Sequence, residues 1–124
     1  GEFQEPTSLR IAAIGEQDEP LGYLLARSVF EEAHLLKLAV VPASRRRGIA
    51  RGLLTTFEGL VTQRGAERAV VDVRAGNEAA RKLYAHAGYQ TLVERPRYYS
   101  NGEGGLLLLK TLDAYHRGEH EDDG

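Results

Sequence analysis

The sequence has no cysteine, no tryptophan and no methionine. Without cysteine it can form neither a disulfide bond nor a thiolate metal site, and no covalent cysteine intermediate is available. Because no initiator methionine opens the sequence, we interpret Gly1-Glu2-Phe3 as a cloning remnant and leave it out of fold reasoning.

Long apolar runs and excess charge of either sign are also missing. No run reaches the roughly 18 to 20 apolar residues needed to span a bilayer, and no secretory leader is recognisable, so we expect a cytoplasmic protein without membrane contact. The formal net charge of −2 disfavours nucleic acid as a partner. The histidines show no metal-ligand spacing, so no metal site is predicted: they are His34, His86, His116 and His120.

What the sequence contains is average for a globular domain. Hydrophobic residues make up 42% and charged residues 27% of its 124 residues. This length is enough for one ordinary core, so we expect a single domain over residues 1–124. The acidic stretch 114–124 is expected to be a frayed tail.

Three apolar runs in the first third predict an antiparallel meander. They lie at residues 9–14, 21–30 and 33–41, and turn-forming residues separate the first two. The two-residue period of a strand assigns the third run to two faces: His34, Leu36, Leu38 and Val40 on one, and Leu35, Lys37, Ala39 and Val41 on the other.

The rest of the chain alternates between helical and strand patterns. After Pro42, apolar residues at helical spacing predict a helix from about Ile49 that ends at Gly65, followed by a buried strand at 69–73. Asn77 can cap a second helix, which Gly88 ends. Strands are then expected at 89–94 and 106–112, joined by a loop. The predicted class is α/β (α+β), with a mixed, mostly antiparallel sheet, one parallel pair and flanking helices.

The segment Arg45-Arg46-Arg47-Gly48-Ile49-Ala50-Arg51 opens the first predicted helix. Free backbone N–H groups and the positive end of the helix dipole meet there, so the segment suits a phosphate. A nucleotide-type cofactor is one interpretation; a solvated charge run and a nucleic-acid backbone patch are the others. The motifs of P-loop kinases and of dinucleotide-binding dehydrogenases are absent.

Two longer segments carry a family resemblance. Leu38-Ala39-Val40-Val41-Pro42, followed by residues 45–54, resembles the acyl-CoA signature of the GNAT superfamily of N-acetyltransferases. Residues 71–89 resemble the second signature of its RimI-type branch, which acetylates protein N-termini, and Tyr98-Tyr99 is similar to that branch as well. The resemblance covers residues 33–112.

The resemblance implies a GNAT-like acyl-CoA N-acyltransferase fold, in which the third and fourth strands splay apart. Acetyl-CoA would then place its pantetheine arm against the backbone near Leu38 and Val40, and its diphosphate against segment 45–51. The implied activity is acetyl transfer to a primary amine by direct attack. A protein N-terminus is slightly preferred over a lysine or a small amine. The alternative is a catalytically weak acyl-CoA-binding sensor module.

The resemblance also implies roles for individual residues. Tyr84 would be the acid that protonates the departing thiolate, although it could be an ordinary amphipathic helix residue. Asp72 stands where the RimI-type branch has a glutamate and would be the base, with a bound water making up for its shorter side chain. His34 is the alternative base, and a third possibility is that neither residue is the base. Asn77 would orient the cofactor or a water, cap the helix, or do both.

One departure from the family concerns the beginning of the chain. Family members start with a strand and two helices, which form the wall of the active site on the acceptor side. This sequence reaches its meander about 30 to 40 residues earlier than those family members do. We therefore expect an exposed apolar sheet face and a possible homodimer.

Overall fold

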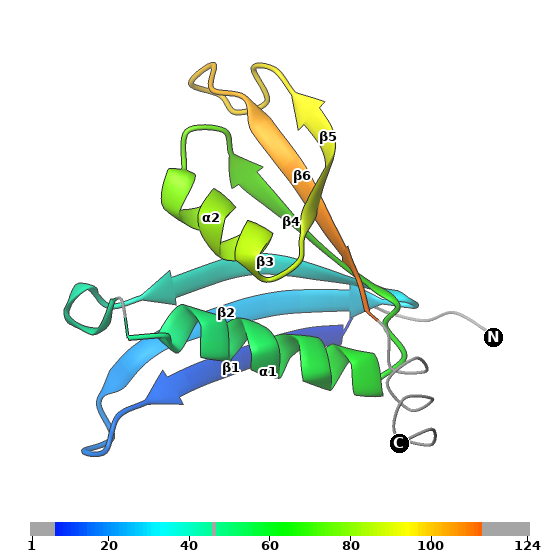
Figure 1. Cartoon of the computed structure of the whole chain (residues 1–124). Coiled ribbons are helices and arrows are strands. Elements are labelled where there is room, and N and C mark those ends of the chain that lie inside the picture. Colours follow the sequence, from blue (N-terminus) through cyan, green and yellow to red (C-terminus); the bar gives the residue numbers. More distant parts are fainter. Residues whose placement is uncertain (1–6, 46, 113–124) are drawn as a thin grey trace.

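A computed structural model describes residues 7–45 and 47–112. The predictions for residues 1–3 and for the tail 114–124 lie outside the described residues. The described chain forms one six-stranded sheet in the order β1-β2-β3-β4-β6-β5, with two α-helices. In Figure 1 the sheet has two wings, β1–β3 below and β4, β6 and β5 above, which meet on the right of the view. The predicted fold class is confirmed.

The lower wing is the predicted meander. Strands β1 (Thr7–Ile14), β2 (Pro20–Val29) and β3 (Glu32–Val40) pair antiparallel in sequence order. Alternate residues of β1 face the core, namely Leu9, Ile11 and Ala13, so Ser8, Arg10 and Ala12 lie on the opposite face.

A bulge overturns the predicted faces of β3. Ala26 pairs with Leu35 and Leu25 pairs with Lys37, which leaves Leu36 as an extra, unpaired residue. One extra residue reverses the alternation beyond it. Leu38 therefore packs against the same core as Leu35, and the predicted grouping of Leu38 and Val40 with His34 was wrong.

The parallel pair is shorter than its strands. Strand β4 (Arg68–Arg74) pairs with β3 only from Glu32 with Arg68 to Leu35 with Val71. Beyond Leu35 and Val71 the two strands diverge, and Figure 1 shows the opening between their arrowheads. The predicted splay is therefore present, and it opens at the C-terminal ends of both strands.

Both helices pack on one face of the sheet. Helix α1 (Ile49–Gln63) follows the 3₁₀ turn Pro42–Ser44 and lies against the lower wing. Helix α2 (Glu78–His86) lies on the upper wing. One buried cluster joins their apolar side chains to the strands, with members that include Phe57, Val61, Tyr84, Leu24 and Val71. Gly65 and Gly88 follow the helices with φ of 100° and 101°, as predicted for helix-ending glycines.

Strands β5 (Gln90–Arg95) and β6 (Gly105–Thr111) form a hairpin that completes the upper wing, with β5 at the edge. The sheet face opposite the helices, which we call the open face, is covered by no described element. Tyr23 and Val93 are both 38% exposed on it. In the described residues, no helix is long and apolar enough to cross a membrane.

Candidate functional site

A cavity of about 530 Å³ lies between the start of α1, the end of β3 and helix α2. It is on the helix side of the sheet, where β3 and β4 diverge. The following residues line it: Leu38, Ala39, Val40, Ser44, Arg45, Gly48, Ile49, Ala50, Arg51, Asn77, Ala79, Ala80, Leu83 and Tyr84. The tertiary structure thus brings most of the predicted cofactor-binding residues onto one surface.

The wall from α1 begins at Gly48, whose φ of 78° is in the left-handed region. This conformation lets the chain turn into the helix, and glycine adopts it without the strain that a side chain would add. The N–H groups of Ile49, Ala50 and Arg51 have no hydrogen-bond partner among the described residues. They are the donors that an anion would occupy.

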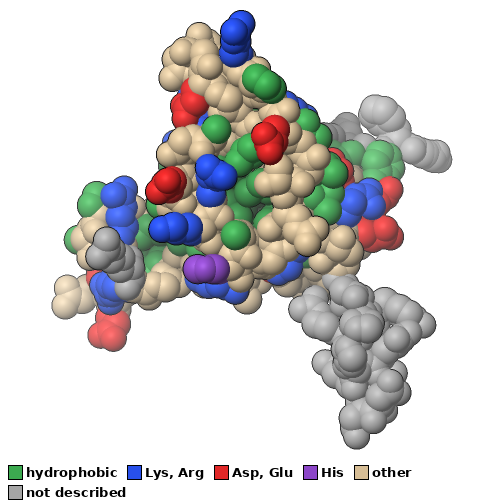
Figure 2. Space-filling view, turned by 45° about the horizontal axis from the view of Figure 1, so that its top comes forward, with side chains coloured by type: hydrophobic (Ala, Val, Ile, Leu, Met, Phe, Trp, Pro, Cys, Tyr) green, Lys and Arg blue, Asp and Glu red, His purple; other side chains and the backbone are tan. Residues whose placement is uncertain are grey.

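The arginines of this segment differ in position. Arg45 lines the cavity and its Nε donates to the Val40 carbonyl at 3.3 Å, which holds its guanidinium beside the end of β3. Arg51 also lines the cavity. Arg47 is exposed and is not among the lining residues, and Arg46 lies outside the described residues. Figure 2 shows basic side chains gathered at the start of α1, on the left of the view.

The wall from α2 carries Asn77 and Tyr84. Asn77 caps the helix, because its Oδ1 accepts a hydrogen bond from the Ala80 N–H at 3.1 Å. Tyr84 is buried, with 4% of its surface exposed, yet its hydroxyl has no hydrogen-bond partner among the described residues. Burial raises the pKa of Tyr84 to about 12, so the hydroxyl keeps its proton at neutral pH.

Tyr84 is held from behind by an aromatic contact. Its ring meets the ring of Tyr89 edge to face, with 5.4 Å between centroids. The Tyr89 hydroxyl donates to Glu58 of α1 at 2.9 Å, and Lys110 of β6 donates to the same carboxylate at 2.8 Å. This polar cluster joins α1 to the upper wing behind the cavity.

Asp72 and His34 lie on the open face. Asp72 is between the core residues Val71 and Val73, so its side chain points away from the helices. It pairs with Arg95 at 3.5 Å and is 38% exposed. His34 is exposed and pairs in register with Val70. Neither residue lines the cavity, and Asp72 and Tyr84 flank the sheet from opposite faces.

The loop between β5 and β6 places two tyrosines beside Asp72. Tyr98 and Tyr99 lie over Gly105, where a Cβ would come within 2.9 Å of the Tyr98 ring and 3.1 Å of the Tyr99 ring. The guanidinium of Arg74 stacks on the Tyr99 ring at 4.0 Å, and that of Arg95 on the Tyr98 ring at 4.9 Å. We call these two arginine–tyrosine pairs the Tyr98–Tyr99 platform. Sequence reasoning missed both arginines, although the tyrosine pair signalled the loop.

A second hollow of about 370 Å³ lies on the far side of α2. Leu106, Leu108 and Tyr89 form part of its lining, with Arg81 and Lys82 on the helix. Figure 2 shows hydrophobic side chains in this hollow, with charged side chains around it. Within residues 7–45 and 47–112, no group of three or more His, Asp or Glu side chains could hold a metal ion.

The donor set of the main cavity fits an acyl-CoA molecule. The helix start offers backbone donors and arginines for a diphosphate. A Cβ atom added at Gly48 would have no neighbouring atom within 4 Å, so the space beside this glycine is open. Leu38 and Val40 belong to the end of β3 that still pairs with β2 but no longer with β4, so backbone groups on the β4 side can bond an extended arm. Leu83 and Ile49 add apolar surface.

Comparisons with known proteins agree with this geometry. The profile of the Acetyltransferase (GNAT) family matches residues 2–89. The [Ribosomal protein bS18]-alanine N-acetyltransferase of Haemophilus ducreyi is 34% identical over 89 residues, which cover 72% of this chain and 61% of that protein. An uncharacterized N-acetyltransferase of Methanocaldococcus jannaschii is 33% identical over 91 residues, covering 73% of this chain and 58% of its own. The chain thus spans about three fifths of the length of these relatives.

Solved structures with a similar fold include another alanine N-acetyltransferase of a ribosomal protein. The crystal structure of the ribosomal-protein-S18-alanine N-acetyltransferase from Escherichia coli has a TM-score of 0.78 at 27% identity. It covers 85% of this chain and 69% of the other. The nourseothricin acetyltransferase structure, with a TM-score of 0.79 at 21% identity, shares the fold. The profile match, the relatives and the splayed sheet together show that this chain belongs to the GNAT family of acetyltransferases.

Proposed function

We propose that this protein transfers the acetyl group of acetyl-CoA to a primary amine, with a peptide N-terminus slightly preferred over a lysine or a small amine. The observation that carries the proposal is the cavity at the splay, which combines the free N–H groups at the start of α1 with the Tyr84 hydroxyl, for which the described residues offer no hydrogen-bond partner. The family and the names of the relatives support the same reaction class.

The cofactor would be bound by residues of both cavity walls. Backbone N–H groups from Gly48 to Arg51, with the Arg45 guanidinium, would hold the diphosphate. Acetyl-CoA supplies an activated thioester, so the enzyme needs no nucleophile of its own. The chain's part is then to bind, orient and move protons.

The proposed proton transfers use the two faces of the sheet. On the open face, Asp72 would accept the amine proton, directly or through a water, with His34 as the rival base. On the helix side, Tyr84, which lines the cavity and carries its proton at neutral pH, would donate that proton to the leaving sulfur. Acceptor and cofactor would therefore approach the split between β3 and β4 from opposite sides.

The preference for a peptide rests on the Tyr98–Tyr99 platform. Tyrosine rings stacked with arginines offer flat surface and polar edges, which suit an extended peptide beside Asp72. The relatives named as alanine N-acetyltransferases of a ribosomal protein act on a protein N-terminus, which favours the same acceptor class.

The test is thiol release from acetyl-CoA in the presence of three acceptor sets. These are peptides with a free N-terminus and no lysine, N-terminally blocked peptides with one lysine, and small polyamines. We expect the fastest release with the first set. Tight acetyl-CoA binding by calorimetry with no release from any amine would replace the proposed activity with the acyl-CoA sensor role, which the Asp72–Arg95 pairing would then explain by blocking the base.

Two further expectations belong to this proposal. The exposed Tyr23 and Val93 on the open face favour a homodimer, which a monomeric mass by light scattering at micromolar concentration would contradict. A cytoplasmic location, where acetyl-CoA is available, is tested by fractionation of cells that produce the protein.

A further inference from the structure

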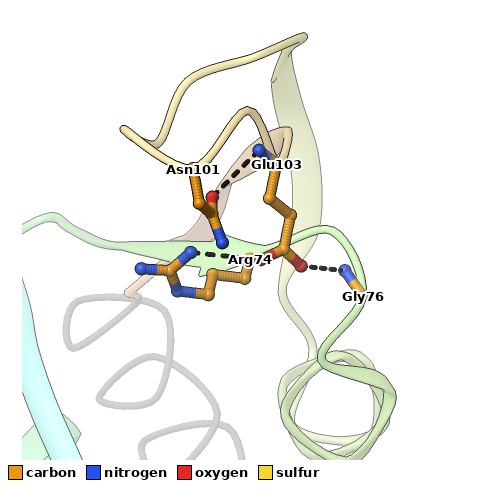
Figure 3. Close-up of polar contacts among 4 residues, drawn as sticks. All are labelled: Arg74, Gly76, Asn101 and Glu103. Carbon is orange, nitrogen blue, oxygen red and sulfur yellow. Dashed lines mark hydrogen bonds and ion pairs between the residues drawn. The ribbon is translucent and has the colours of Figure 1, made fainter.

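Glu103, in the loop between β5 and β6, contacts the turn between β4 and α2 with both carboxylate oxygens. Its Oε1 accepts a hydrogen bond from Arg74 Nη1 at 3.1 Å, and its Oε2 accepts one from the Gly76 N–H, also at 3.1 Å. Figure 3 shows these contacts, with the carboxylate between the arginine and the backbone of the turn. The two contacts join segments 27 and 29 residues apart in sequence.

The loop that carries Glu103 is ordered by its own hydrogen bonds. The Glu103 N–H donates to Asn101 Oδ1 at 3.0 Å, also drawn in Figure 3, and its carbonyl accepts from the Tyr99 N–H at 3.0 Å. The Gly102 N–H donates to the Tyr99 carbonyl at 2.9 Å. These hydrogen bonds hold the backbone of Glu103 next to that of Tyr99, and the Glu103 carboxylate reaches the Tyr99 ring through Arg74, which stacks on it.

The turn on the other side is a firm anchor. Gly76 directly precedes Asn77, the cap of α2, and the Ala75 N–H donates to the Gly104 carbonyl at 2.9 Å. Arg74 is the last residue of β4, with its guanidinium stacked at 4.0 Å on the Tyr99 ring. Glu103 thus fixes the guanidinium on which one half of the Tyr98–Tyr99 platform rests.

We propose that Glu103 is a positioning residue for the acceptor: by holding Arg74 and the Gly76 amide together it sets the Tyr98–Tyr99 platform beside Asp72. The inference rests on the proposed function, because the platform matters only if an acceptor binds there. A carboxylate suits the task because two acceptor oxygens serve two donors at once. The amide of glutamine offers one acceptor oxygen, and aspartate is shorter by about 1.5 Å.

The test compares Glu103→Ala, Glu103→Gln and Glu103→Asp with the wild type. Acceptor binding is read by fluorescence polarisation with a labelled peptide that has a free N-terminal alanine, in the presence of CoA, and by the acceptor KM. Acetyl-CoA affinity is read by calorimetry. Glu94→Ala is the matched control, because Glu94 is an exposed glutamate of the same hairpin without a hydrogen bond or ion pair to any described residue.

In Glu103→Ala we expect the peptide Kd and the acceptor KM to rise about ten-fold, the effect of a lost positioning contact. Acetyl-CoA affinity should stay within about twofold of wild type, because the diphosphate segment is on α1. Glu103→Gln should fall between wild type and Glu103→Ala, and Glu94→Ala should match wild type. Arg74→Ala should cause a similar loss, and the double variant Arg74→Ala with Glu103→Ala should lose little more, because each single change already removes the Arg74–Glu103 contact.

Amide hydrogen exchange makes a negative result decisive. Faster exchange at Gly76 in Glu103→Ala shows that the contact is broken; an unchanged peptide Kd would then overturn the inference. Equal losses of peptide and acetyl-CoA affinity would assign Glu103 to general folding and overturn it as well. If the wild type binds peptide but releases no thiol, only the proposed catalysis fails. If the wild type binds no peptide but acetylates a small amine, the inference about Glu103 and the peptide preference fail, and the proposed acetyl transfer stands.

Discussion

Leu35 and Val71 form the last pair of the parallel β3–β4 ladder, and the next residue of β4 is Asp72. The base candidate therefore lies at the point where the sheet opens. On the opposite face, Tyr84 lines the cavity that extends along the diverging end of β3. Where β3 and β4 separate, no backbone lies between the two faces of the sheet, so side chains on opposite faces can reach one substrate. The proposed base Asp72 and the proposed acid Tyr84 can therefore act in one reaction.

Replacing Tyr84 by phenylalanine should lower kcat about 100-fold, the usual size of a general-acid contribution. Acetyl-CoA affinity should change little, because the ring remains in its contact with Tyr89. Tyr23→Phe, an exposed site on the open face, is the matched control and should keep full activity. Equal losses in kcat and in cofactor affinity would mean that Tyr84 is structural.

Gly48→Val should weaken acetyl-CoA binding about ten-fold or more while kcat at saturation stays close to wild type. The φ of 78° costs a side chain about 1 to 2 kcal/mol, so the helix start would shift away from the geometry that offers its N–H groups. Gly59→Ala, inside α1 with open space around its Cβ direction, should stabilise the helix and leave binding unchanged. Calorimetry measures both; equal affinities for the two variants would contradict this role of Gly48.

Asp72→Asn should reduce kcat about 100-fold near neutral pH, because an amide cannot accept the amine proton. Asp72→Glu should retain activity, since it keeps the carboxylate and extends its reach. His34→Gln should remain within about twofold of wild type. A large loss in His34→Gln together with an active Asp72→Asn would transfer the role of base to the histidine.

Alkaline pH should destabilise the protein partly through Tyr84. Its pKa is raised to about 12 in the folded state from an ordinary value of 10, so the folded state disfavours ionisation. The associated stability is fully present below pH 10 and is lost as the pH rises towards 12, by on the order of 2 kcal/mol. Urea unfolding of wild type and Tyr84→Phe from pH 9 to 11.5 should show the phenylalanine variant gaining relative stability. Parallel pH profiles would argue against this linkage.

Glu58→Ala should lower the free energy of unfolding by about 2 kcal/mol, because the Tyr89 hydroxyl and the Lys110 ammonium lose their shared partner. The double change Glu58→Leu with Lys110→Met should recover much of the loss, since it removes both charges from a partly buried site. Thermal denaturation provides the comparison. If the double variant is no more stable than Glu58→Ala, the unpaired charge is not the cause.

Local sequence patterns were enough to predict the elements and to mark segment 45–51 as a candidate anion site, whereas its assignment to acetyl-CoA came from the family resemblance. Apolar periodicity, Asn77 and the glycines at 65 and 88 act over one or two helical turns, so their effects can be read directly along the chain. The segment 45–51 likewise follows from its position at a helix start. Hence the strands and helices occur in the predicted order, and their bounds agree with prediction to within a few residues.

The β3 bulge shows where such reasoning stopped. Strict alternation assigned Leu38 to the face of His34, but the extra residue at Leu36 reverses the faces, because the strand must pair with β2 and still present Leu38 to the core. The polar residues of this run do carry a signal, because His34 and Lys37 are three positions apart and can share the open face only if one extra residue lies between them. The bulge is a compromise between pairing and packing, and only the assembled sheet contains both.

The acceptor side depended on tertiary structure for a similar reason. Arg95 meets Asp72, and Arg74 meets Glu103 and Tyr99, only because β4, β6 and β5 lie side by side in the sheet. These contacts join residues 23 to 29 positions apart on exposed surface, where no periodic pattern records a partner. The sequence alone determined which chemical groups the protein possesses and where the chain turns; the packing of its two wings decided which groups meet.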